Sequence, residues 1–502
     1  MHGNSLFFRL ILALILTLLV FVHVWRLSTL PRGLYVDESS IGYNAYLIAH
    51  TARDEHGVLL PIYFKAFGEY KNPLYIYTTA GLFSLFGVSE FTLRLTSALY
   101  FFLFLLLLFL LLRELFQDKP WIGLFGLLAA GLLPWFFPLS RIAFEVVSQL
   151  TCVVALLLCV SKVLTTNEKT LSWWHVATGF LLGISIYSYS TARLITPLFA
   201  FFIFLLFVWR KEFAGLLAVV VGTLYALVPF IFFAVQNPGA LTERFRLITY
   251  IYDPALTYGA RMHGFVIRYF SYFKPKWLLA VGDGNLRHHI GFGGEVFYAV
   301  FLLAIVGFAY PFIVRDKNRR AMFVIILGLL IISPVAGALT QDQNALRTVL
   351  LGLAILIMSC YGLFVLTKIP IRGLKVLLVT FACLSLVFEG AVYLRSYFLS
   401  YPKLSAYAFE SYGFKEALIG DLAQNPERIV VSEKSNQPYV QAAFYKIVLK
   451  TMVPIYVGEL VLGPRLCLVY FSPKEFNTSW VGHKIVYSFS EQGFPVRSKC
   501  FK

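Results

Sequence analysis

The chain has 502 residues, of which 59% are hydrophobic and 14% are charged, and its formal net charge is +17. An interior of this size cannot hide so much apolar surface from water, so the composition excludes a soluble globular protein. The positive charge fits contacts with anionic lipid headgroups or phosphates. Because no nucleic-acid-binding motif accompanies it, we expect no nucleic-acid partner.

Apolar runs recur along the chain at about 17–22 residues, the length that crosses a bilayer core as a helix. They predict an all-α polytopic membrane protein with about eleven transmembrane helices. The first run is followed by Val24-Trp25-Arg26 rather than by the small residues of a cleavage site, so we expect a retained helix. The expected spans lie near residues 6–25, 91–112, 121–138, 146–163, 173–190, 194–209, 213–233, 296–314, 321–339, 349–366 and 376–393.

Short loops rich in Lys and Arg predict the orientation, because such loops stay on the cytoplasmic side. A cytoplasmic N-terminus places all of them inside. The longer segments 28–90 and 235–295, and everything after about residue 394, then lie outside. We expect a multi-pass protein of the cell membrane with its C-terminal region extracytoplasmic. The basic loops are residues 113–119, 162–169, 210–211, 315–320 and 368–375.

Hydrophobicity falls in the C-terminal region, where short apolar runs surround a helical stretch at 407–422. These runs predict buried strands. We therefore expect a transmembrane module over 1–394 and a small extracytoplasmic α/β domain over 395–502. Cys467 and Cys500 both fall in this domain, and their spacing does not decide whether they pair. The expected strands are residues 428–432, 445–449, 454–457 and 466–471.

Polar clusters at the external ends of the spans are candidates for function, because polar groups near membrane depth are costly. Tyr35–Ser40 opens a predicted interfacial helix. Adjacent residues do not share a helix face, so at most one of Asp37 and Glu38 should point at a reaction centre. The alternative is that both acids only stabilise the start of the helix, where the helix dipole favours negative charge.

Further along, Lys71 stands just before an apolar helix. A lysine there can hold a phosphate as a point charge, or it can simply reach lipid headgroups. Arg141 and Glu145 have i, i+4 spacing, which favours a local ion pair; an arginine facing a buried anion is the alternative. Another polar stretch, Tyr187–Arg193, lies at the end of the expected span 173–190.

The loop Gly282–Glu295 combines glycines with arginine and histidine, a pattern that can cradle a phosphate or sugar or form an ordered turn. His263, His288 and His289 raise the question of a metal. Because the adjacent histidines lack the i, i+4 spacing of helical zinc motifs, we expect no metal site. Gln341–Arg347 is a similar polar end before the next span.

Together these motifs resemble the polyprenyl-phosphate-sugar glycosyltransferases of the GT-C superfamily. Its members include the protein O-mannosyltransferases and the transferases that put aminoarabinose on lipid A. The resemblance is to the bacterial glycosyltransferase family 39 or 83 type. VDESSIGYNAYLIA, LPIYFKAFGEYKNPLYIY and FGVSEFTLRLTSAL resemble the first external loop and second helix. SRIAFE, GISIYSYSTARLITP, GDGNLRHH and ALTQDQNALR resemble patterns of bacterial members. Many members read Lys-Pro-Pro where this chain has Lys71-Asn72-Pro73.

The resemblance implies the GT-C fold and an inverting transfer of a monosaccharide from a polyprenyl-phosphate donor to a protein, lipid or glycan acceptor. Asp37 would bind and deprotonate the acceptor, Glu38 would orient the acceptor or support the site, and Lys71 would hold the carrier phosphate. Further candidates for binding the phosphate are Arg193, Arg287 and Arg347. Candidates for binding substrate are Tyr70, Arg141, Glu145, Tyr189, Asp283, Asn285 and His288.

The chemistry agrees with this division of roles. Phosphate is already a weak base, so one carboxylate base suffices, and cations stabilise the departing charge. Such a reaction needs no metal to hold a pyrophosphate, and we expect no cofactor.

Two other functions remain open. A transporter or flippase should show internal repeats and charges near mid-bilayer, whereas here the charges lie at span ends on one side. A glycan polymerase, ligase or oligosaccharyltransferase is the other. Oligosaccharyltransferases usually carry Trp-Trp-Asp in the C-terminal domain, but the pair Trp173-Trp174 begins a span and is typical of an interfacial anchor.

Overall fold

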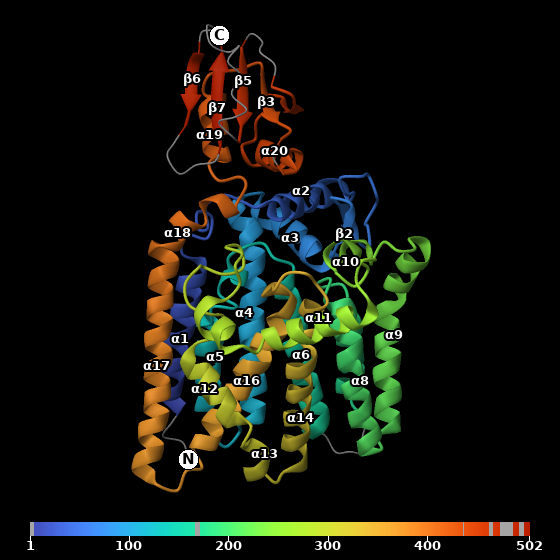
Figure 1. Cartoon of the computed structure of the whole chain (residues 1–502), viewed down its shortest axis with the longest axis vertical. Helices are drawn as coiled ribbons and strands as arrows, with labels where there is room; N and C mark the ends of the chain where they lie inside the picture. Colours follow the sequence, from blue (N-terminus) through green and yellow to red (C-terminus); the bar gives the residue numbers. More distant parts are fainter. Residues whose placement is uncertain are drawn as a thin grey trace.

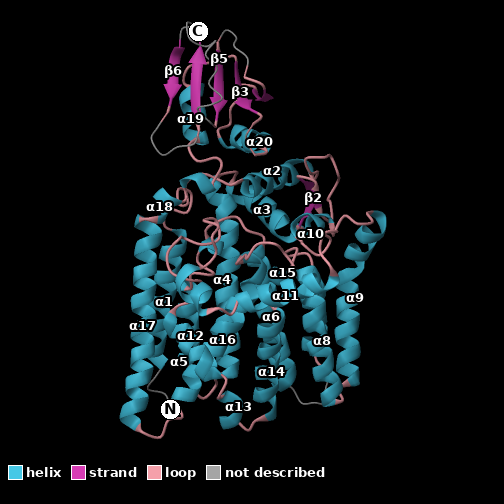
Figure 2. Cartoon of the chain, in the orientation of Figure 1, coloured by secondary structure: helices cyan, strands magenta, loops and turns pink. Residues whose placement is uncertain are grey.

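The computed structural model describes the chain except for residues 1–4, 166–170, 435, 461–464, 472–484, 491–495 and 502. Long helices form an upright bundle, and a small domain with a β-sheet stands on one end of it (Figures 1 and 2). Shorter helices and a hairpin lie between the two. This intermediate layer holds the polar clusters.

Each expected span coincides with a helix, and eight of the described helices are long and apolar enough to cross a membrane. The upright helices pack against one another through buried side chains. Their outward-facing side chains are apolar and exposed, as contact with a lipid bilayer requires. The long helices are α1 (Ser5–Val24), α4 (Glu90–Leu115), α6 (Val146–Thr165), α8 (Ala192–Arg210), α9 (Phe213–Gln236), α14 (Lys317–Ile332), α16 (Val349–Leu366) and α17 (Arg372–Leu399).

Three expected spans are shorter helices than the apolar runs predicted: α5 (Trp121–Leu132), α7 (Trp173–Ser185) and α12 (Tyr298–Gly307). Pro134 follows α5, and Pro311 interrupts the run after α12, where only the short α13 (Tyr310–Ile313) continues. Proline lacks the amide hydrogen that a helix interior uses, so an apolar run can be longer than its helix. The chain after α7 turns through Tyr187–Thr191 instead.

The intermediate layer comes from the two long loops. The first contains α2 (Val36–Thr51), the hairpin of β1 (Phe64–Ala66) and β2 (Glu69–Lys71), and α3 (Pro73–Phe86). The second contains α10 (Glu243–Ile248), α11 (Tyr258–Ser271) and a π-helical turn at Trp277–Val281. Shorter connections add 3₁₀ turns at Pro138–Ser140 and Leu346–Thr348 and the short α15 (Val335–Ala338).

The C-terminal domain has a five-stranded sheet with strand order β4-β3-β5-β7-β6. Strand β3 is parallel to β4 and β5, whereas β7 is antiparallel to β5 and β6. A disulfide joins Cys467 to Cys500 across β5 and β7. The elements are α18 (Tyr401–Leu404), η4 (Ala406–Ala408), α19 (Phe414–Leu422), β3 (Arg428–Ser432), α20 (Pro438–Val448), β4 (Ile455–Gly458), β5 (Leu466–Tyr470), β6 (Ile485–Phe489) and β7 (Arg497–Phe501).

One predicted strand of this domain is wrong. Residues 445–449 form the end of helix α20, which Pro438 opens at its first turn. Val440, Phe444 and Tyr445 are all buried in that helix. A short apolar run cannot be told from a buried helical turn by hydrophobicity alone, which explains the error. The other three expected strands are present, and β6 and β7 were not foreseen.

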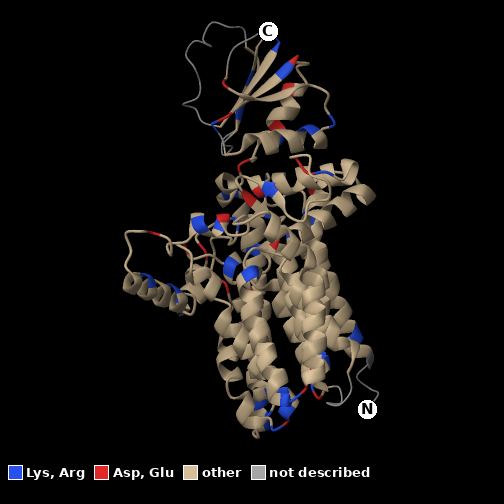
Figure 3. Ribbon diagram, turned by 90° about the vertical axis from the view of Figure 1, so that its right-hand side faces the viewer, with Lys and Arg blue, Asp and Glu red and all other residues tan. Residues whose placement is uncertain are grey.

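Lys and Arg gather at the end of the bundle farthest from the C-terminal domain (Figure 3). This distribution is the one that the basic-loop prediction requires, although part of the loop 162–169 lies outside the described residues. The orientation itself stays a prediction, as does a domain boundary at residue 394. Helix α17 continues without a break to Leu399.

Candidate active site

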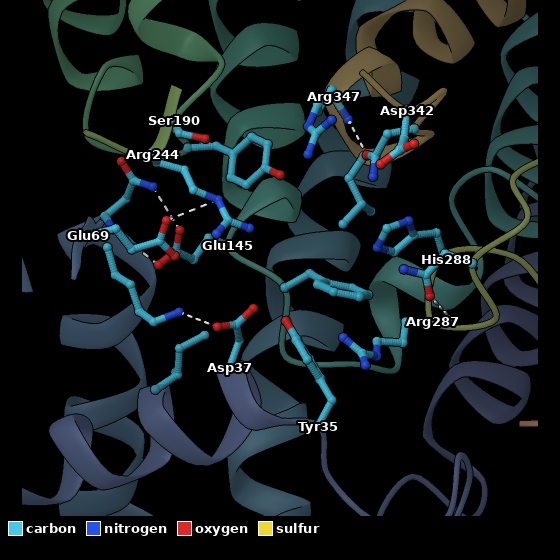
Figure 4. A pocket seen from close by; sticks show the side chains of 18 of the residues that line it. Tyr35, Asp37, Glu69, Glu145, Ser190, Arg244, Arg287, His288, Asp342 and Arg347 are labelled. Carbon is cyan, nitrogen blue, oxygen red and sulfur yellow. Dashed lines mark hydrogen bonds and ion pairs between the residues drawn. The ribbon is translucent and has the colours of Figure 1, made fainter. Parts of the chain in front are cut away.

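A cavity of about 570 Å³ opens in the intermediate layer, where α2, the hairpin, α10 and several inter-helix turns meet. Its wall is dominated by charged and hydroxyl-bearing side chains (Figure 4). The polar residues that line it include Tyr35, Asp37, Glu69, Tyr70, Lys71, Asn72, Glu145, Tyr189, Arg193, Arg244, Asp283, Asn285, Arg287, His288, Asp342 and Arg347.

Asp37 and Lys71 form an ion pair on this wall. The Lys71 Nζ atom donates a hydrogen bond to Oδ1 of Asp37 at 2.5 Å. Lys71 is 7% exposed, whereas the Asp37 side chain is 42% exposed and faces the cavity. Strand β2 ends at Lys71 and α2 begins at Val36, so the start of a helix and the end of a hairpin bring the two charges together.

The charges around Asp37 decide its protonation state. Burial alone would raise the pKa of the Asp37 carboxyl. The cations Lys71, Arg244 and Arg287 lower it by more than burial raises it, so the pKa lies below its usual value. The carboxylate is therefore ionised at neutral pH. In Figure 4, Arg244 lies above Asp37 and Arg287 lies to its right.

Glu38 points away from the cavity, as the prediction for adjacent residues on a helix requires. Its carboxylate makes a two-fold ion pair with Arg94, with distances of 2.9 and 3.1 Å, and both side chains are fully buried. The same carboxylate accepts hydrogen bonds from the amides of Tyr35 and Ala143 at 3.3 and 3.0 Å. Glu38 thus joins the start of α2 to α4 and to the turn before α6, and it does not line the cavity.

Glu145 faces the cavity from the other side of Lys71. Its two carboxylate oxygens accept hydrogen bonds from the backbone and side-chain amides of Asn72, at 3.1 and 2.7 Å. Burial raises its pKa to about 7, against the lowering effects of Lys71 and Asn72. Asn72 in turn accepts a hydrogen bond from Arg193 at 2.9 Å, which fixes that guanidinium beside the cavity.

The predicted ion pair between Arg141 and Glu145 does not form. Residues 141–145 make turns rather than a helix, because α6 begins only at Val146, so the i, i+4 spacing does not bring the side chains together. Arg141 is fully buried and does not line the cavity. Its guanidinium donates to carbonyl groups of Val22 and Trp25, at 2.7 and 2.8 Å, and so secures the end of α1.

The loop of Asp283 and the turn before α16 are fastened to each other. The Asp283 carboxylate bonds to Nδ1 of His288 at 2.9 Å and accepts the amide of Ala345 at 2.7 Å. These contacts lower the pKa of Asp283, although burial raises it. They join the loop that carries Arg287 to the turn that carries Arg347, and both arginines line the cavity, with His288 between them in Figure 4.

The cavity collects most of the candidates named from the sequence. The structure brings together Asp37, Tyr70, Lys71, Glu145, Tyr189, Arg193, Asp283, Asn285, Arg287, His288 and Arg347, and it leaves out Glu38 and Arg141. Burial raises the pKa of Tyr189 to about 12, so its phenol remains a hydrogen-bond donor.

Sequence reasoning missed Arg244. It lies on α10 and forms an ion pair with Glu69 at 3.1 Å, with 54% of its own side chain exposed. The only available signal was a short basic run after α9, which looks like an ordinary solvated turn. Asn72, Ser190 and Asp342 were also not singled out, although each lines the cavity.

No group of histidine and carboxylate side chains with metal-ligand spacing is found at the cavity among the described residues. Within that part of the chain, the group close enough to share an ion is Asp421 with Cys467 and Cys500, and the two cysteines are bonded to each other. His288 instead pairs with Asp283. A reaction without metal stays a prediction.

Known proteins share this architecture. Residues 70–234 match the family model of the dolichyl-phosphate-mannose-protein mannosyltransferases. The crystal structure of ArnT from Cupriavidus metallidurans in the apo state aligns over 97% of both chains with a TM-score of 0.59 at 13% identity. The chain therefore has the GT-C fold that its sequence predicts. No curated protein sequence matches it.

Two further structures share this fold. ArnT from Cupriavidus metallidurans bound to undecaprenyl phosphate aligns over 97% of both chains, with a TM-score of 0.59 at 12% identity. AglB from Archaeoglobus fulgidus, in complex with an inhibitory peptide and a dolichol-phosphate, has a TM-score of 0.51 at 16% identity. The alignment covers 89% of this chain but 64% of AglB. The predicted fold is thereby confirmed.

Proposed function

We propose that this protein is a glycosyltransferase that moves a monosaccharide from a polyprenyl-phosphate carrier to an acceptor nucleophile, with inversion and without a metal. The observation that carries the proposal is the ion pair of Asp37 and Lys71 on the wall of a cavity with four arginines. A carboxylate base and a group of phosphate-binding cations are the two parts that such a transfer needs.

Asp37 is the proposed base. Because neighbouring cations lower its pKa, the carboxylate is ionised at neutral pH and can accept a proton from an acceptor hydroxyl. The acceptor oxygen attacks the anomeric carbon as the bond to the phosphate oxygen breaks. The proton goes to Asp37 and the bonding electrons leave with the phosphate. One displacement inverts the configuration at the anomeric carbon.

Lys71, Arg193 and Arg347 are the proposed phosphate ligands. The donor phosphodiester carries one negative charge, and the departing carrier phosphate gains a second, so fixed cations bind the transition state more strongly than the ground state. Arg193 and Arg347 form no ion pair with any residue that the structure describes. Arg193 is held by Asn72, and Arg347 by Thr340 at 2.8 Å.

Two observations support a polyprenyl carrier as donor. The cavity lies at the ends of apolar helices, so a phosphate at the interface would leave its prenyl chain in the bilayer. The similar structures were solved with undecaprenyl phosphate and with a dolichol-phosphate. We place the site on the extracytoplasmic face, because the basic loops lie at the opposite end of the bundle (Figure 3). The acceptor is a protein, lipid or glycan.

A transfer assay with the purified protein in lipid vesicles tests the proposal. It offers a panel of radiolabelled polyprenyl-phosphate monosaccharides and, in parallel, nucleotide sugars, each with and without EDTA. We expect label to leave one carrier-linked sugar for an acceptor or water, unaffected by EDTA. Use of a nucleotide sugar, or complete loss of transfer in EDTA, would contradict the proposal. Movement of an intact carrier lipid across the same vesicles would instead support a flippase.

A further inference from the structure

The connecting segment, residues 408–412, leads into the C-terminal domain and runs beside the residues that precede Asp37. Leu34 and Ser411 bond in both directions: the Ser411 amide donates to the Leu34 carbonyl at 3.0 Å, and the Leu34 amide donates to the Ser411 hydroxyl at 2.5 Å. At Gly33, which has φ +75°, a Cβ would lie 2.7 Å from the Tyr412 backbone nitrogen. The two segments are therefore in tight backbone contact.

Glu410 uses this contact to reach two parts of the active site. Its Oε1 accepts a hydrogen bond from Nη2 of Arg287 at 2.7 Å. Its Oε2 accepts the amide of Val36, the first residue of α2, at 3.3 Å. A carboxylate at a helix N-terminus is electrostatically favoured. One side chain thus links the helix that carries Asp37 to Arg287, which lines the cavity.

Arg287 is held along one edge and free along the other. Its Nε donates to the Ala408 carbonyl at 2.6 Å, so the connecting segment binds both Nε and Nη2. The Nη1 group makes no hydrogen bond within the described part of the chain, and Arg287 lines the cavity. The guanidinium also lies against the Tyr35 ring, 5.3 Å from its centre. Figure 4 shows Arg287 and Tyr35 on the same side of the cavity.

We propose that Glu410 is a positioning residue, which aims the free edge of Arg287 at the donor phosphate and fixes it relative to Asp37. Glu410 does not line the cavity itself. Through it, the segment that leads into the C-terminal domain completes the active site. An arginine that is oriented in advance needs no rearrangement when charge develops on the leaving phosphate. This inference rests on the proposed function, because it assigns Arg287 to a phosphate.

A double-mutant cycle on the full-length protein tests the assignment. Glu410→Ala should lower kcat/KM for the donor by about tenfold to about a hundredfold, the usual cost of a misplaced catalytic group. Glu410→Gln should lose less, because its amide oxygen still accepts from Arg287. In an Arg287→Ala background, either change should cost less than about twofold, because the residue it acts through is gone.

Glu427→Ala is the matched control. It removes a carboxylate of the same domain whose partner, Arg465, lies 3.3 Å away, with both side chains more than half exposed. We expect no change in turnover. Thermal unfolding of every variant shows whether a loss of activity comes from a destabilised fold or from a misoriented Arg287. If Glu410→Ala is poorly folded, Glu410→Gln alone completes the cycle.

Two outcomes would overturn the inference. Full activity in Glu410→Ala is one. The other is an equal loss with and without Arg287, which would mean that Glu410 acts through the α2 N-terminus alone. If the wild-type protein transfers no sugar at all, the proposed function fails first. The same cycle is then run on the Kd for undecaprenyl phosphate, where a non-additive loss still supports the link and additive effects reject it.

Discussion

Asn72 donates hydrogen bonds from both its backbone and its side-chain amide to the two carboxylate oxygens of Glu145. Many GT-C members that this chain resembles have proline at this position, which has no backbone amide hydrogen. The departure from Lys-Pro-Pro is therefore not neutral in this protein. Asn72, next to Lys71, joins Glu145 and Arg193 into one network.

Replacing Asn72 separates the two bonds. Asn72 has φ −83°, close to the value that proline requires, so Asn72→Pro fits the backbone. Asn72→Ala removes only the side-chain bond, whereas Asn72→Pro also removes the backbone bond to a buried carboxylate. We expect Pro to be the less stable variant by about 1–2 kcal/mol. Thermal unfolding in detergent measures the difference, and equal stability of the two would contradict the backbone bond.

Lys71→Ala should weaken donor binding. Loss of a charge-assisted contact to phosphate costs about 1.5–3 kcal/mol, which corresponds to a Kd roughly 10–100 times higher. The measurement is equilibrium binding of a polyprenyl-phosphate sugar. Lys65→Ala is the control, since Lys65 is exposed on the neighbouring strand of the same hairpin and does not line the cavity. Unchanged affinity in Lys71→Ala would remove its assigned role.

Glu145 should give the activity a pH dependence near neutrality. Its raised pKa of about 7 means that the carboxyl is protonated below that pH and becomes negative above it. A new negative charge beside the proposed phosphate ligands disfavours an anionic donor. We therefore expect kcat/KM to fall as pH rises through about 7, because this parameter reports the free enzyme. Glu145→Gln should abolish that fall, and an unchanged profile would contradict the assignment.

The buried pair of Glu38 and Arg94 should control stability rather than turnover chemistry. Removing one partner leaves an uncompensated buried charge, so Glu38→Met or Arg94→Met alone should destabilise the fold by about 3–5 kcal/mol. The double variant should recover much of this loss. Thermal unfolding of the three variants makes the comparison. A fully stable Glu38→Met protein without activity would point instead to direct contact with the acceptor.

Much of the fold could be predicted from the sequence, because a bilayer demands long apolar helices and these are visible as runs. The span positions, the acidic motif and most of the cavity residues follow from such runs and from the polar clusters at their ends. The assignment of one inward-facing acid followed from helix geometry alone. Asp37 and Glu38 do face different ways.

The wrong and missed predictions share one cause: they depend on tertiary contacts, which a local sequence pattern does not reveal. Arg141 and Glu145 had the spacing of a helical pair, but no helix exists there, and each side chain bonds to distant residues. Arg244 enters the site only because α10 folds over the hairpin. Residues 445–449 are apolar enough for a strand, yet they end helix α20, which packs against α2 of the intermediate layer.

The central claim is that Asp37 removes the acceptor proton while the cations around it hold the donor. The most direct test compares the wild-type protein with Asp37→Asn in two assays: sugar transfer from a polyprenyl-phosphate donor, and equilibrium binding of that donor. The account predicts that Asp37→Asn abolishes transfer and leaves the Kd for the donor largely unchanged. Near-normal turnover in Asp37→Asn would show that the base lies elsewhere.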